Sequence, residues 1–433
     1  MWDGRRRMSR SALALALLAA ATAFAAPNAE PYPQPTSKKG LQVQMVDDAL
    51  ALRIQHAGLN CHVASLVDLE AKPDSLKFTY DGADYFFRRG SVTALDAQIK
   101  PLSDHGVVVS LILLNYENGD DALNEIFMHP KYARGEKHNR VSAFNVLTSE
   151  GTRHLRAAIA FLAQRYSDQA APHGRVWNYI VGNEVNSHWW WNNQGPADVA
   201  TLVNDYERTV RLVHENVTAH LANARVFLSL EHHWNIAYQP GEPQKSCPGR
   251  ELVKQFARVA RERGDFAWHI AFHPYPENLG DPRFWNDKTA MPGDDTPRIT
   301  FKNLEVLTRF LARPEMLFAG RPRRVILSEQ GFHCMDQPDG EQLQAAAYAA
   351  AWIKVARLPG IDAFILHRHV DHAHEGLNLG LWTHKPGTVF VPDRHRAMYE
   401  TFRAADTPDW EKAFAFALPV VGAKSWEEFA PTR

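Results

Sequence analysis

Two glutamates that are far apart in the sequence each follow a short apolar run. Glu184 comes shortly after Val176 to Val181, and Glu329 comes after Val325 to Leu327. A carboxylate at the end of a buried strand is costly unless it meets a cleft, a partner or water. Paired carboxylates across a cleft can hydrolyse a glycosidic bond, because one donates a proton to the leaving oxygen while the other attacks the anomeric carbon. An ion-paired structural glutamate is the alternative for either residue alone.

Other polar residues also stand where apolar runs end, so we expect them to face the same cleft. Amide, imidazole and phenol groups there can bind sugar hydroxyls, and we predict substrate contacts from Asn115, Asn183, Glu231, His273, Tyr275, His367 and Arg368. Glu231 is the main rival for a catalytic role, and a structural salt bridge is its alternative.

The run Trp189-Trp190-Trp191 follows Glu184 closely. Three consecutive tryptophans cannot all face one core, so at least one should line an open surface. Flat aromatic faces suit the apolar faces of sugar rings. We therefore predict sugar stacking in the cleft, with Trp189 and Trp190 as candidates.

Histidines are dense at the predicted strand ends, and Asp371 lies among them. Such groups can ligate a transition metal. However, the sequence has no HExxH pattern, and the first predicted strand, Leu41 to Met45, has no H-x-H. We expect no metal and no cofactor. A metal-dependent hydrolase and a non-catalytic carbohydrate-binding barrel remain the alternatives. The histidines concerned are His232, His233, His367, His369, His372 and His374.

Strand-like and helical patterns alternate along the chain, which predicts a single-domain α/β structure, a (β/α)8 TIM barrel. The expected strands cover residues 41–45, 59–66, 107–114, 176–181, 226–230, 267–272, 325–327 and 361–366. The expected helices lie near residues 47–57, 92–103, 149–166, 198–220, 250–263, 300–312, 341–357 and 393–404. Connections entering the strands are short and those leaving them are long, so the site should lie at the C-terminal face.

The order of these motifs resembles clan A glycoside hydrolases, which are retaining (β/α)8 enzymes. The resemblance rests on Gly182-Asn183-Glu184 at strand four, His273-Pro274-Tyr275 at strand six and Ser328-Glu329 at strand seven. It implies that Glu184 is the acid/base and Glu329 the nucleophile. It also implies that Asn183 contacts a substrate hydroxyl, while His273 and Tyr275 orient the nucleophile and contact substrate.

Two features depart from the clan's usual pattern. Many members carry an arginine near the end of strand two, where this chain offers His62 or, further on, Arg88 and Arg89. Many also carry a tryptophan after strand eight, where this chain has His367-Arg368-His369. The residues that contact the sugar beside the nucleophile are therefore expected to differ.

Residues 1–25 are predicted to be a signal peptide, since arginines precede an apolar stretch and an A-x-A cleavage site. The protein is therefore expected to be exported, to the periplasm or outside the cell, without a membrane partner after cleavage. Residues 26–40 should form a linker and 41–433 the catalytic domain. A net charge of −1 gives no indication of nucleic-acid binding, so a carbohydrate is the expected partner, and the oligomeric state is open. Cys61, Cys247 and Cys334 could form one disulfide or stay buried thiols.

Overall fold

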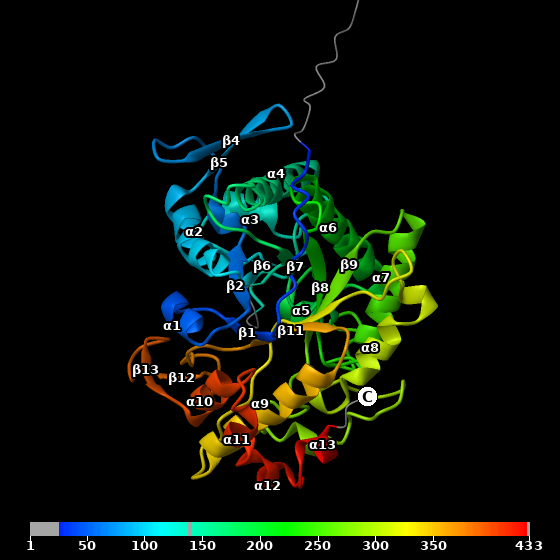
Figure 1. Cartoon of the computed structure of the whole chain (residues 1–433). Helices are drawn as coiled ribbons and strands as arrows, with labels where there is room; N and C mark the ends of the chain where they lie inside the picture. The colour runs from blue at the N-terminus through cyan, green and yellow to red at the C-terminus, as the bar shows by residue number, and fades with distance from the viewer. Residues whose placement is uncertain (1–25, 137–140, 431–433) are drawn as a thin grey trace, which may run out of the picture.

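A computed structural model of the chain describes residues 26–136 and 141–430 (Figure 1). The predicted signal peptide, residues 1–25, lies outside the described residues. Within the described ranges, no helix is both long enough and apolar enough to cross a membrane. All three cysteines are free thiols with buried side chains.

Eight parallel strands close into a barrel, which confirms the predicted (β/α)8 fold. They follow one another around the barrel in sequence order, so each strand pairs with the next barrel strand and the last pairs with the first. The strands are β1 (Lys39–Gln42), β2 (His56–His62), β6 (Val108–Leu114), β7 (Asn178–Val181), β8 (Arg225–Glu231), β9 (Trp268–His273), β10 (Val325–Leu327) and β11 (Ile361–Leu366).

Helices surround the strands, as Figure 1 shows, and each predicted helical pattern has a counterpart. Side chains that face outward from the strands join these helices in one large apolar cluster, while a smaller cluster that includes Ile112, Phe227 and Ile326 fills the barrel interior. The helices are α1 (Val46–Ala51), α2 (Arg89–Asp104), α4 (Ser149–Arg165), α6 (Val199–His220), α7 (Gly249–Glu262), α8 (Glu305–Leu311), α9 (Gly340–Arg357) and α10 (Ala397–Ala404).

The long connections leave the C-terminal ends of the strands and contain further elements. A three-stranded sheet follows β2, one short helix each follows β6 and β7, and a two-stranded sheet follows β11; three short helices follow the barrel. These are β3 (Val67–Asp68), β4 (Leu76–Tyr80), β5 (Ala83–Phe87), α3 (Asp121–Phe127), α5 (His188–Trp191), β12 (Trp382–His384), β13 (Pro392–His395), α11 (Trp410–Phe414), α12 (Ala417–Val421) and α13 (Trp426–Phe429).

The predicted boundaries of the second strand were wrong. We expected residues 59–66, whereas β2 covers His56–His62. The backbone turns into the helical region at Val63, and a 3-10 turn follows at Ala64–Leu66. Val63, Ala64 and Leu66 are all buried, so an apolar turn extended the strand-like pattern beyond the true strand.

The segment predicted as a linker is an ordered arm along the barrel, and its last two residues open β1. The Asn28 backbone N–H donates to the carbonyl of His220 at 2.8 Å, beside the C-terminal end of α6. The Tyr32 hydroxyl donates to the Asn178 side chain at 3.1 Å, at the start of β7. This arm, dark blue in Figure 1, therefore lies along the N-terminal ends of barrel strands.

Candidate active site

Glu184 is presented by a tight turn at the end of β7. Gly182 has φ of +71°, and a Cβ there would lie 2.5 Å from the Asn192 side-chain oxygen. Glu184 itself has φ 41° and ψ 51°, a left-handed conformation that is unusual for a residue with a side chain. Its backbone N–H donates to the Ser229 hydroxyl at 3.0 Å. The turn thus holds a costly backbone conformation in place, as functional sites often do.

Glu329 follows β10 directly, where the chain passes close to the end of β11. A Cβ on Gly331 would lie 2.1 Å from the carbonyl oxygen of His367, so only glycine permits this approach. The Gln330 side chain donates to the Ile365 carbonyl at 2.6 Å and ties the two strand ends together. This packing places Glu329 at the mouth of the barrel, where its side chain is partly exposed.

His273 and Tyr275, at the end of β9, lie between the two glutamates. His273 Nδ1 is 2.9 Å from Glu184 Oε1, and its Nε2 is 3.0 Å from the Ser328 hydroxyl. The Tyr275 hydroxyl donates to Glu329 Oε1 at 3.4 Å. Ligand atoms of Glu184, His273 and Glu329 all lie within 4.8 Å of one another. The structure therefore brings these four predicted site residues together.

The surroundings of Glu184 make its carboxyl a weaker acid than an exposed glutamate. Burial raises the pKa of Glu184, and the hydrogen bond and charge of His273 only partly offset that rise. Burial lowers the pKa of His273, but its hydrogen bond to Glu184 and the charge of Glu329 raise it above the ordinary value. Burial, followed by the charge of Glu329, raises the pKa of Tyr275 well above its usual range, so its hydroxyl remains a donor.

Glu231, at the end of β8, is fully occupied by its own hydrogen bonds. One carboxylate oxygen accepts from the side chains of Asn186 and Ser187, and the other accepts from the backbone and ring of His233. Burial raises the pKa of Glu231, but its hydrogen bonds to the ring and backbone of His233 outweigh burial and lower the pKa to about 2. This carboxylate holds the β7 and β8 ends together.

Glu231, His232 and His233 also form a group whose ligand atoms could approach one metal ion. The Arg298 guanidinium, which can only donate, lies 3.2 Å from His233 Nε2. His233 therefore accepts at Nε2 and carries its proton on Nδ1, which donates to Glu231 at 2.6 Å. In this tautomer Nδ1 offers no lone pair, so the group fits a hydrogen-bonded brace better than a metal centre.

The three tryptophans lie in different environments. Trp189 is buried, with the Lys245 ammonium 4.9 Å from its ring centre. Trp190 is half-buried and meets Tyr238 edge-on at 4.8 Å between ring centres. Trp191 is 36% exposed and Tyr238 is 45% exposed. We call these three rings on the loops after β7 and β8, Trp190, Trp191 and Tyr238, the aromatic rim, and sugar stacking on it stays a prediction.

The two predicted asparagines differ in whether their side chains are already hydrogen-bonded. Asn115 is buried and donates to the Phe127 carbonyl at 2.7 Å, so it anchors the loop after β6. Asn183 is half-buried, and its side chain makes no hydrogen bond with the residues that the structure describes. Asn60, which sequence reasoning missed, is exposed although it lies within β2. It pairs with Ile112, whose side chain fills the barrel interior, so Asn60 points into the open mouth.

The residues after β11 contact the glutamates through Gln42, which sequence reasoning also missed. Gln42 ends β1, and its side-chain amide lies 3.5 Å from Glu329 Oε2 and 2.6 Å from His367 Nδ1. The other nitrogen of His367 lies 2.6 Å from Glu375, which also accepts from Arg368 at 2.9 Å. The signal in the sequence was the alternation of apolar and polar residues in Leu41-Gln42-Val43-Gln44, which sets Gln42 on the face opposite Leu41.

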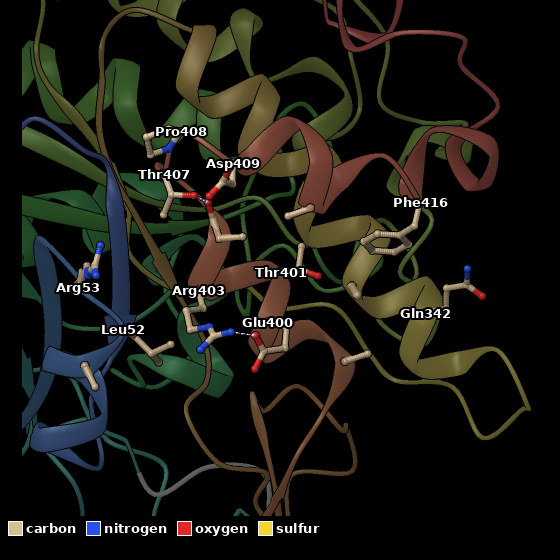
Figure 2. A pocket seen from close by; sticks show the side chains of 15 residues that line it. Leu52, Arg53, Gln342, Glu400, Thr401, Arg403, Thr407, Pro408, Asp409 and Phe416 are labelled. Carbon is tan, nitrogen blue, oxygen red and sulfur yellow. Dashed lines mark hydrogen bonds and ion pairs between the residues drawn. The ribbon is translucent and has the colours of Figure 1, made fainter.

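A separate cavity of about 860 Å³ lies at the side of the barrel, between α1, α9, α10 and α11. Figure 2 shows its lining, where Glu400 and Arg403 form an ion pair and Phe416 lies at one end. None of the site residues predicted from the sequence lines this cavity. The candidate active site is the open mouth of the barrel and not this lateral cavity.

Comparison with known proteins gives a family and a fold. The model of one protein family matches residues 31–429, most of the chain. The chain belongs to this family, DUF5722. DUF5722 is described as a family of unknown function. No curated protein matches the sequence.

Solved structures with the same fold as this DUF5722 protein include glycoside hydrolases. A family 39 glycoside hydrolase from Bacteroides cellulosilyticus WH2 matches with a TM-score of 0.54 and 14% identity, over 85% of this chain and 63% of that chain. A hyperthermophilic beta-glucosidase from Pyrococcus furiosus matches with a TM-score of 0.51 and 13% identity, over 87% and 86%. At such identities the likeness establishes the barrel fold alone.

Proposed function

We propose that this DUF5722 protein is a retaining glycoside hydrolase that acts on a poly- or oligosaccharide. The observation that carries the proposal is that one carboxylate oxygen of Glu184 and one of Glu329 lie within 4.8 Å of each other at the barrel mouth. A separation of about 5 Å suits direct attack on the sugar, whereas inverting enzymes need about 6.5–9.5 Å to admit a water molecule.

In this mechanism Glu184 is the acid/base. Burial raises the pKa of Glu184, which favours the protonated carboxyl that must donate to the leaving oxygen. The ring of His273, 2.9 Å away, can share that proton and then return it. After the leaving group departs, Glu184 accepts a proton from the water that attacks the intermediate.

Glu329 is the nucleophile in the same mechanism. It lies opposite Glu184, is partly exposed, and accepts from the Tyr275 hydroxyl at 3.4 Å. Its carboxylate attacks the anomeric carbon and forms a glycosyl-enzyme, which water then hydrolyses with net retention. Asn183 and Asn60 lie free near the two glutamates and are the proposed contacts to sugar hydroxyls.

The experiment is a hydrolysis screen of the purified protein against 4-nitrophenyl glycosides and polysaccharides, with Glu329→Gln as the matched inactive control. We expect release of reducing sugar by the wild type alone, and ¹H NMR should show that the first product keeps the substrate's anomeric configuration. An inverted first product contradicts the retaining mechanism. Saccharide binding without turnover, equal in both proteins, contradicts the enzyme proposal.

We also propose export by the segment at residues 1–25. The support is its sequence, with arginines, an apolar stretch and an A-x-A site. N-terminal sequencing of the protein recovered from a bacterial host should begin after Ala25. A mature protein that retains Met1 contradicts this proposal.

A further inference from the structure

Gln42 links the proposed nucleophile to the loop after β11, and its amide can be oriented in only one way. On the β10 side it faces the Ser328 carbonyl at 3.3 Å and Glu329 Oε2 at 3.5 Å, which are both acceptors. The NH₂ group must therefore point to β10, and the carbonyl oxygen must point to His367.

The ring of His367 then meets an acceptor at each nitrogen. Nδ1 lies 2.6 Å from the Gln42 side-chain oxygen, and Nε2 lies 2.6 Å from Glu375 Oε1. A neutral imidazole carries one proton and would leave one of these short contacts without a hydrogen. Two donors are required, so the geometry makes His367 an imidazolium.

Glu375 supplies the counter-charge that this cation needs. Burial raises the pKa of Glu375, but its hydrogen bond to His367 and the charges of His367 and Arg368 lower it to about 2. The carboxylate is mostly buried, with 22% of its side chain exposed, and it has a salt bridge on each oxygen. Charges of alternating sign thus extend from Glu329 through His367 and Glu375 to Arg368.

The other charged groups around this ring are few. Glu329 approaches from β10 through Gln42, and Tyr275 at the end of β9 lies within electrostatic range of Glu375. His372, on the same loop as Glu375, is within range of Arg368. The C-terminal end of β1 contributes Gln42, which is uncharged. Among the described residues Glu375 is the carboxylate in direct contact with the ring, so its negative charge is the one that can balance a second ring proton.

We propose that Gln42 and His367 are positioning residues, in which an imidazolium held by Glu375 fixes the Gln42 amide and thereby aims the carboxylate of Glu329. This rests on the proposed role of Glu329 as nucleophile. Glu329 has only two side-chain donors among the described residues, Tyr275 and Gln42. A small misplacement of a reacting group can cost about 100-fold in rate, so the second donor matters.

The first test measures the charge of His367 and needs no substrate. Long-range ¹H–¹⁵N NMR of the histidine-labelled full chain should show both ring nitrogens of His367 protonated at pH 7, with the peaks assigned by their absence in His367→Gln. In Glu375→Gln the same ring should be neutral at that pH. A neutral ring in the wild type, or a charged one in Glu375→Gln, overturns the proposal.

The second test measures positioning, with a 2,4-dinitrophenyl glycoside of whichever sugar the wild type hydrolyses. Gln42→Leu and His367→Gln should each lower kcat about 10- to 100-fold with KM unchanged. His374→Gln, an exposed histidine on the same loop, should match the wild type. A raised KM with unchanged kcat means that His367 contacts the sugar directly and overturns the proposal. Circular dichroism checks that each variant is folded.

The two tests separate this proposal from the proposed function. A wild-type protein that hydrolyses no glycoside contradicts the enzyme assignment, while the NMR result still decides whether the charged ring exists. If the wild type hydrolyses glycosides and Gln42→Leu has the same kcat, the proposed function stands and the positioning role of Gln42 is contradicted.

Discussion

Two carboxylates at opposite ends of the same barrel differ in how closely they are paired. At the N-terminal end, Asp362 accepts from Arg225 and from Arg324 at 2.9 Å each, and the Arg225 guanidinium lies 3.4 Å from the centre of the Tyr32 ring. At the C-terminal end, Glu329 has only long contacts, at 3.4 and 3.5 Å. The Asp362 carboxylate at the first end is fully paired and stabilises the fold. The Glu329 carboxylate at the second end makes weaker contacts, as the proposed nucleophile requires.

The sharpest test of this contrast is removal of the available carboxylates. Glu329→Ala should reduce turnover about 10⁴-fold or more without loss of stability, because no glycosyl-enzyme can form. Glu184→Ala should still be glycosylated by an activated aryl glycoside but should hydrolyse the intermediate slowly. Azide should restore turnover in both variants, with a retained product from Glu184→Ala and an inverted one from Glu329→Ala. The same azide stereochemistry from both contradicts the assigned roles.

At the opposite end, removal of a charge should affect the fold and not the chemistry. Asp362→Ala leaves two guanidinium groups without their partner and should lower the free energy of unfolding by about 2–4 kcal/mol. Chemical denaturation measures this loss, and kcat at a temperature where the variant is folded should be unchanged. The control is Glu262→Ala, which removes an exposed partner of Arg258 and should cost less than about 0.5 kcal/mol.

Glu231, like Glu375, departs from this contrast at the C-terminal end, because its carboxylate is held as firmly as that of Asp362. Burial raises its pKa, but His233 brings the pKa to about 2, below the usual 4.5. The folded state therefore favours the ionised carboxylate, so this stabilisation is present above about pH 4.5 and is lost as the pH falls to about 2. Between these values the wild type should lose about 2–3 kcal/mol more stability than Glu231→Gln in urea titrations. If the free energy of unfolding depends on pH in the same way in both proteins, this stabilising role of Glu231 is contradicted.

The aromatic rim should give the smallest effect. Trp190→Ala should raise KM about 3- to 10-fold with little change in kcat, if the ring stacks equally well on substrate and transition state. Trp189→Ala is the matched control, because its ring is buried and its loss should lower stability instead. A Trp190→Ala variant with wild-type KM removes this ring from the binding site.

The barrel could be predicted because each strand and helix leaves a local pattern in the sequence. The end of β2 could not, since Val63 to Leu66 are as apolar and buried in a turn as they would be in a strand. The sheet of β3, β4 and β5 was also missed, because it lies within a connection that the pattern indicated only as long.

That Glu184, Glu329, His273 and Tyr275 lie close together could be predicted, because each stands where a barrel strand ends. The site was not predictable where it depends on pairings between strands. The contact of Gln42 with His367 joins residues 325 positions apart. Nor does the sequence reveal that Asn186 and Ser187 occupy Glu231, because this depends on the turn that Glu184 begins.

The docked arm at residues 26–38 has a practical consequence for anyone who handles the protein. Asn28 is fixed beside His220, near the N-terminal ends of the barrel strands and opposite the barrel mouth. A resin, an affinity tag or a second protein joined ahead of Asn28 would therefore be attached beneath the barrel. Protein immobilised in this way should have the mouth of its barrel facing the solution, where even a long, insoluble polysaccharide could reach it.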